Sequence, residues 1–149
     1  PIGSRGLGDV YKRQPSVWWC GIRVTKIDHI SCQVKVIHRW INQNPFKSMF
    51  WAVQGMAAEL TTGVLIMEAI QNSKRKVSML VLNNRANFSK KARGKVLFEC
   101  YEKQKLSKAM NQLVKTQQPQ TIWLTSKGID QNGDIVSTFE FEWTLLLKN

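Results

Sequence analysis

Residues 49–67 read MFWAVQGMAAELTTGVLIM, and Glu59 is the single charged residue in this stretch. Its apolar residues do not keep to one stripe, so the pattern predicts a long helix enclosed on nearly all sides. Asn44 is a good N-cap before Pro45, and Ser48 is a competing cap one turn later. We therefore expect the helix to begin near these residues.

A membrane span is the alternative for this stretch. Its apolar side chains favour insertion by roughly 2 to 4 kcal/mol in total, but a mid-helix carboxylate costs about 2.5 to 3.5 kcal/mol. Gln54, two glycines and two threonines add nothing to insertion. Because the sum is near zero, we expect no membrane association.

The residues around this helix predict strands. Apolar residues alternate over 21–40, 77–88 and 96–100, and strictly over 138–145. Residues 105–115 form a short amphipathic pattern that predicts a helix. The connections are too short for parallel crossovers, so the strands should be antiparallel. A curved antiparallel sheet wrapped around the long helix, an α+β fold, accounts for a helix that is apolar all round.

Composition limits the possible partners. The 149 residues suit one domain, and 43% hydrophobic with 21% charged residues is ordinary globular composition. Twenty-two Lys and Arg against 10 Asp and Glu give a formal charge of +12, which favours anionic partners such as nucleic acid, lipid headgroups or a phosphorylated cofactor. Charge alone does not choose among them.

The cysteines and histidines give no sign of a metal site. Cys20, Cys32 and Cys100 are scattered and lack CxxC spacing, which argues against a disulfide framework or zinc and fits a reducing cytoplasm. His29 and His38 are the only histidines, and no cluster has ligand spacing. We expect neither a metal nor a cofactor.

The first residues differ from the rest. Residues 1–14 read PIGSRGLGDVYKRQ, with no apolar period and no signal-peptide core. The GDVYKRQ part looks like the translated adapter that contaminates the ends of environmental shotgun assemblies. We therefore expect residues 1–14 to be a non-native segment, and residues 15–149 to form a single domain.

Glu59 is the strongest candidate for chemistry. Burying an uncompensated carboxylate is expensive, and desolvation raises its pKa toward the range where it can act as a base. The equally weighted alternative is an interface carboxylate that is satisfied by an Arg, an Asn or a backbone N–H.

Residues 44–52, NPFKSMFWA, followed by residues 59–63, ELTTG, are similar to the loop and helix of hot-dog-fold acyl-CoA thioesterases. The chain looks most like a thioesterase-like hot-dog family whose members are largely uncharacterised. The similarity extends to residues 87–94 and to 133–143, and covers roughly residues 20–147. It implies a hot-dog fold and an acyl-CoA or related thioester as substrate.

The resemblance also implies roles for individual residues. Glu59 matches the helix acid that acts as general base or nucleophile, and Asn44 matches a loop residue near the bound carbonyl. The backbone amides of Phe50, Trp51 and Ala52 at the helix start would stabilise the oxyanion, as free N–H groups and the positive end of a helix can.

Helix geometry adds a prediction about assembly. Trp51 and Glu59 are eight residues apart, so about 12 Å separates them along one helix. One subunit therefore cannot bring both to one carbonyl. If they cooperate, Glu59 must face the helix start of a second copy, so we expect at least a homodimer, or a dimer of dimers.

The basic residues suggest a phosphate site. Arg85, Lys90, Lys91 and Arg93 could hold the phosphates of coenzyme A, with arginine suited to bidentate contacts. Such a charge run is more often a solvated turn.

Two other functions remain open from the sequence. One is a non-catalytic hot-dog protein that binds an acyl group or another ligand, with Trp51 closing the site. The other, less favoured, is a nucleic-acid-binding domain that uses the basic surface with Trp18, Trp19 and Trp123. No nucleic-acid-binding motif supports it.

Overall fold

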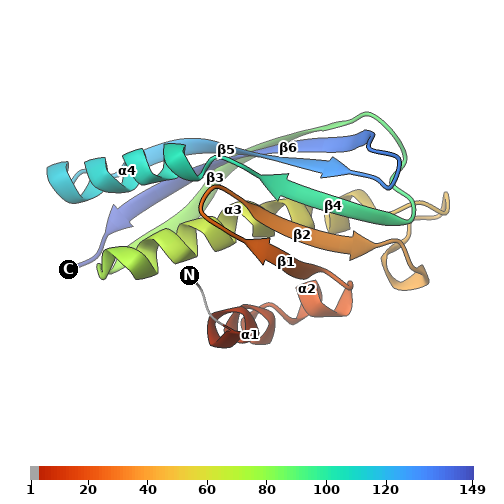
Figure 1. Ribbon diagram of the computed structural model, residues 1–149, viewed down its shortest axis with the longest axis horizontal. Helices are drawn as coiled ribbons and strands as arrows, with labels where there is room; N and C mark the ends of the chain where they lie inside the picture. The colour runs from red at the N-terminus through yellow and green to blue at the C-terminus, as the bar shows by residue number, and fades with distance from the viewer. Residues whose placement is uncertain (1–3) are drawn as a thin grey trace.

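The structure is a computed structural model that describes residues 4–149. Its centre is a six-stranded antiparallel sheet in the order β1-β2-β4-β5-β6-β3, which curves around one long helix (Figure 1). The expectation of an α+β fold with a sheet-wrapped helix is confirmed. The strands are β1 (Arg23–Ile27), β2 (Cys32–Ile37), β3 (Val77–Phe88), β4 (Lys95–Cys100), β5 (Gln120–Ile129) and β6 (Ile135–Leu147).

The central helix, α3, spans Trp51–Ser73. Most of its residues from Val53 to Glu68 are buried, as the sequence predicts. The exceptions in this range are Met67, which is exposed, and Gly55, Met56 and Glu59, which are half-buried. One side of the helix therefore stays open.

The helix begins close to the predicted place, but both predicted caps of α3 were wrong. Its N-cap is Phe50, which makes no side-chain capping bond. Asn44 and Ser48 cap no helix because they bond to each other in the preceding turn, where the Asn44 N–H donates to the Ser48 carbonyl at 2.8 Å. A short 3-10 helix, η1 (Trp40–Asn42), precedes this turn.

The inner face of the sheet supplies the core around α3. In β6 the alternation predicted from sequence places Phe139, Phe141, Trp143 and Leu145 inside. A glycine is needed in β5, because a Cβ on Gly128 would lie 2.6 Å from the ring of Phe98 in the neighbouring strand. The sheet and helix therefore pack closely over most of their length.

The predicted short helix is also present. Helix α4 spans Lys103–Thr116 and buries Leu106, Ala109, Met110 and Leu113. It lies at the end of the molecule opposite to the segment that joins β2 to α3 (Figure 1). Among residues 4–149, no helix has both the length and the apolar character that crossing a bilayer requires.

Two helices precede β1. Helix α1 spans Ser4–Arg13 and α2 spans Pro15–Trp19. Val10 of α1 packs into the core at 6% exposure, and the Tyr11 hydroxyl accepts a hydrogen bond from the Val24 N–H at 2.8 Å. This segment therefore covers part of the α3 side of the molecule.

Strand β3 forms one edge of the sheet. It pairs with β6 from Val77 to Phe88, with a bulge between Val81 and Asn83, and its other edge is free within residues 4–149. Beyond Val81, its residues are exposed on both faces. A long, exposed edge strand with unpaired backbone groups is a surface that another strand can extend.

Candidate active site

Glu59 lies near the middle of α3, on the open side of the helix. Burial raises the pKa of its carboxyl group, and no other cause contributes to the shift. Within residues 6–149, no hydrogen bond or ion pair reaches this carboxylate. The alternative in which Glu59 is satisfied by an Arg, an Asn or a backbone N–H is therefore not seen among the described residues.

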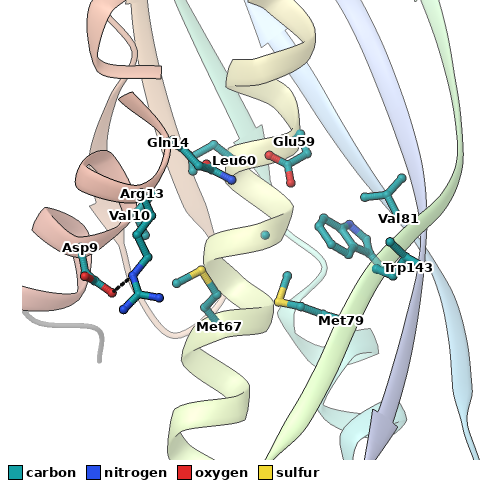
Figure 2. A pocket seen from close by; sticks show the side chains of 12 residues that line it. Asp9, Val10, Arg13, Gln14, Glu59, Leu60, Met67, Met79, Val81 and Trp143 are labelled. Atoms are coloured by element: carbon teal, nitrogen blue, oxygen red, sulfur yellow. Dashed lines mark ion pairs between the residues drawn. The ribbon is translucent and has the colours of Figure 1, made fainter. Parts of the chain in front are cut away.

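The Glu59 carboxylate faces a mostly apolar cavity of about 500 Å³. In Figure 2, Glu59 and the Trp143 ring lie on the same hollow, with Met67 and Met79 beneath them. Leu60, Leu80 and Val81 complete the apolar wall. Helix α1 contributes Asp9, Val10 and Arg13, and Gln14 follows it. Arg13 does not neutralise Glu59, because it pairs with Asp9 at 3.0 Å.

Gly63 and Trp143 shape the space around the carboxylate. A Cβ on Gly63 would lie 3.4 Å from Glu59 Oε1 and 3.8 Å from the Trp143 ring. The Trp143 indole N–H donates to Thr62 Oγ1 at 3.0 Å, and that hydroxyl donates to the Glu59 backbone carbonyl at 2.8 Å. The Trp143 ring is thus fixed relative to the turn of α3 that carries Glu59.

The start of α3 offers two free backbone donors. The Phe50 N–H donates to the Asn42 carbonyl at 2.9 Å, so it is already engaged. Within residues 4–149, the N–H groups of Trp51 and Ala52 have no hydrogen-bond partner, and the first turn holds no acidic residue. Such a helix start favours an anionic oxygen.

Asn44 holds the loop before the helix. Its Oδ1 accepts from the Phe46 N–H at 2.9 Å and from the Ser48 N–H at 3.2 Å, while its Nδ2 donates to Ser48 Oγ at 3.0 Å. One Nδ2 hydrogen is left for another acceptor. The side chain therefore has a structural role in the turn whatever else it contacts.

The structure places the helix start and Glu59 on different hollows. Asn44, Phe50 and Trp51 line a second cavity of about 600 Å³, which does not include Glu59. This separation agrees with the distance of about 12 Å that eight residues span along a helix. A single chain therefore does not bring the predicted base and the predicted oxyanion donors together.

Two of the four predicted phosphate ligands have partners in the fold. Arg85 pairs with Glu140 on the outer face of the sheet, and its guanidinium lies 4.7 Å from the Trp123 ring centroid. Lys90 Nζ contacts Asp130 at 2.7 Å and Asp134 at 2.8 Å, and these hydrogen bonds raise the pKa of Lys90.

The other two cations are exposed. Lys91 and Arg93 line a hollow of about 360 Å³ together with Lys90 and the turn at residues 130–132. Arg85 is not among the residues of that hollow. The structure thus brings three of the four predicted phosphate ligands together and places the fourth elsewhere.

The sequence reasoning missed several residues that line the Glu59 cavity. Gly63 follows Glu59 by four residues, the spacing that places two residues on one face of a helix. In the alternating last strand, Trp143 lies at one of the positions whose side chains point inward. The sequence alone contains both of these signals. Met67 follows Gly63 by the same four residues, whereas Met79 could not be found, because only the folded chain brings β3 beside α3.

The profile described as a domain of unknown function, DUF4442, matches residues 9–145. No curated protein matches the chain.

Solved structures share this fold over nearly the whole chain. A Pseudomonas aeruginosa protein of unknown function, described as a probable thioesterase, is 17% identical at a TM-score of 0.86, with 99% of this chain and 98% of that chain covered. A Chlorobaculum tepidum protein of unknown function is 13% identical at a TM-score of 0.83, with 98% of this chain and 94% of that chain covered. A Haemophilus influenzae thioesterase is 10% identical at a TM-score of 0.73, with 98% of this chain and 94% of that chain covered. The chain therefore has the fold of these thioesterase-like hot-dog proteins.

Proposed function

Since the chain belongs to the DUF4442 family and has the hot-dog fold, we propose that it hydrolyses a thioester, an acyl-CoA or a related compound, with Glu59 as the general base. One observation carries this proposal. A carboxylate with a raised pKa and no partner among residues 6–149 faces an apolar cavity large enough for a small ligand.

The reaction follows from the chemistry of these groups. The Glu59 carboxylate takes a proton from water as the water oxygen attacks the thioester carbonyl carbon. The carbonyl oxygen becomes an oxyanion, which accepts hydrogen bonds from the free N–H groups of Trp51 and Ala52. The carbon–sulfur bond then breaks, and the proton held by Glu59 passes to the leaving thiolate. The products are a carboxylic acid and a thiol.

This assignment needs two copies of the chain. Because Glu59 and the Trp51 amide lie on separate hollows of one chain, the amides must come from a partner. The exposed β3 edge, with Leu80, Leu82 and Phe88 uncovered, supports pairing of two copies. We assign the catalytic unit to a homodimer with its sites between the subunits.

The remaining predicted residues have supporting roles. The free Nδ2 hydrogen of Asn44 can contact the carbonyl or the thioester, and Asn44 also fixes the loop beside the helix start. Of the predicted phosphate ligands, Lys91 and Arg93 take part in no ion pair within residues 6–149, and Lys91 lines the same hollow as Asn44.

Hydrolysis of a panel of acyl-CoA thioesters tests the proposal. We expect Glu59→Gln to lower kcat by about 100-fold to 10,000-fold, the range for loss of a general base. Glu142→Gln is the matched control, because Glu142 lies on the outer face of the sheet, where it accepts from Asn83 at 2.9 Å. No hydrolysis by the wild type, or equal hydrolysis by wild type and Glu59→Gln, would refute the assignment.

Sedimentation of the same samples tests the dimer. Full activity in a stable monomer would contradict a site shared between subunits. A dimer that binds acyl-CoA without hydrolysing it would instead identify a non-catalytic binding protein.

A further inference from the structure

The loop before α3 carries large apolar side chains into solvent. Trp40 is 84% exposed and Phe46 is 72% exposed, and Ile41 is also uncovered. The segment between β2 and α3 extends beyond one end of the sheet (Figure 1). Aromatic residues dominate the binding energy of protein interfaces, so their exposure here marks a contact surface.

The loop is rigid, which suits a contact surface. The Asn44 side chain bonds to Phe46 and Ser48, and an isolated bridge pairs Gln43 with Met49. Lys47, at the tip, has φ of 59°, a conformation that non-glycine residues adopt at some cost. The fold therefore orders the backbone that carries Phe46 and Lys47, which lowers the backbone entropy lost when a partner binds.

The charge of this surface is positive and unbalanced. The sequence has no Asp or Glu from residue 29 to residue 58. Within residues 6–149, Arg39, Lys47 and Lys91 take part in no ion pair. Lys91 Nζ lies 6.0 Å from the centroid of the Phe46 ring, so cation and aromatic group are adjacent. An acidic partner would complement this surface.

The surface borders the hollow at the helix start. Phe46 and Lys91 line the same 600 Å³ cavity as Trp51. A partner seated on the loop could therefore extend a thioester toward the free amides. By contrast, a thioester of coenzyme A would need cations for its nucleotide phosphates. Two of the predicted phosphate ligands, Arg85 and Lys90, are already paired with carboxylates.

We propose that the surface formed by Arg39, Trp40, Ile41, Phe46, Lys47 and Lys91 docks a small acidic carrier protein that presents the acyl group on a phosphopantetheine arm. This inference rests on the proposed thioesterase function and names the form of its substrate. Acidic side chains of the carrier meet Arg39, Lys47 and Lys91, and its apolar side chains cover Trp40 and Phe46. The arm enters the hollow at the helix start.

The test compares three thioesters of the same acyl group: an octanoyl group on an acidic acyl carrier protein, octanoyl-CoA and octanoyl-pantetheine. We expect Lys47→Glu and Trp40→Ser each to lower kcat/KM for the carrier by about tenfold, with a stronger effect at low salt for Lys47→Glu. Octanoyl-pantetheine, which has neither protein nor nucleotide, should be hydrolysed at the wild-type rate by both variants. Lys108→Glu is the matched control, because Lys108 is exposed on α4 at the opposite end of the molecule.

Binding of the non-acylated carrier protein, followed by fluorescence anisotropy, separates the two proposals. Binding that Lys47→Glu weakens, without hydrolysis of any thioester, retains the docking surface and overturns the thioesterase. Hydrolysis and binding that are both unaffected by Lys47→Glu and Trp40→Ser overturn the docking surface. Lys47-dependent binding to vesicles of anionic phospholipid, with unchanged carrier kinetics, also overturns it and assigns the loop to a lipid surface.

Discussion

The substitution Gly63→Ala separates the stability of α3 from the reactivity of Glu59. Alanine in a helix interior is about 1 kcal/mol more favourable than glycine. The new Cβ would lie 3.4 Å from Glu59 Oε1, a tight contact but not an overlap, and 3.8 Å from the Trp143 ring. The variant should therefore be more stable by roughly 0.5–1 kcal/mol, which raises Tm by about 2 °C.

The same methyl group removes water from the Glu59 carboxylate. Desolvation already raises the pKa of this group, so Gly63→Ala should raise it further. The acid limb of the pH dependence of kcat/KM should then move to higher pH, because the base must be ionised. Activity at low pH falls even though the protein is more stable.

Gly55→Ala is the matched control for this experiment. Gly55 also lies in α3, and its Cβ would meet the Phe139 ring at 3.4 Å rather than a carboxylate. Thermal melting should show similar stabilisation in both variants, whereas the pH–rate profile should shift in Gly63→Ala alone. Identical profiles for the two variants would show that Glu59 is not the group whose ionisation controls the reaction.

Three further predictions concern stability and burial. Because the pKa of Glu59 is raised, the folded state binds its proton more tightly than the unfolded state does. The free energy of unfolding should therefore fall as pH rises from the ordinary pKa of 4.5 through the folded-state pKa. In denaturant titrations at several pH values, Glu59→Gln should remove this slope. Lys103→Met should cost about 3–5 kcal/mol by urea unfolding, because it leaves Glu68, 3% exposed, without its ion-pair partner, and adding Glu68→Gln should restore much of the loss. A chain that begins at Pro15 should keep the circular dichroism signal of the sheet, because all six strands follow that residue. In this shortened chain the pKa of Glu59 should fall toward its ordinary value, because α1 forms one wall of the Glu59 cavity. An unchanged pH–rate profile in that shortened chain would contradict the last prediction.

The sequence predicted the elements whose pattern is local. The strict alternation in residues 138–145 identified β6 and its inward residues, because a strand exposes alternate side chains to opposite faces. The uniformly apolar stretch around Glu59 identified a helix that needs cover on most sides. The caps of that helix were wrongly predicted, because Asn44 and Ser48 can cap a helix or close a turn, and packing of the loop decided for the turn.

For the site, sequence by itself singled out Glu59, because an acid in an apolar helix is costly wherever that helix packs. The rise of an α-helix, about 1.5 Å per residue, also sufficed to separate Glu59 from the helix start. Only the tertiary structure decided which groups surround the carboxylate and which cations are free. Arg85 pairs with a carboxylate of β6, and Lys90 pairs with carboxylates of the 130–134 turn, so neither is free for a ligand. These pairs join residues far apart in the chain, and no local sequence pattern encodes such contacts.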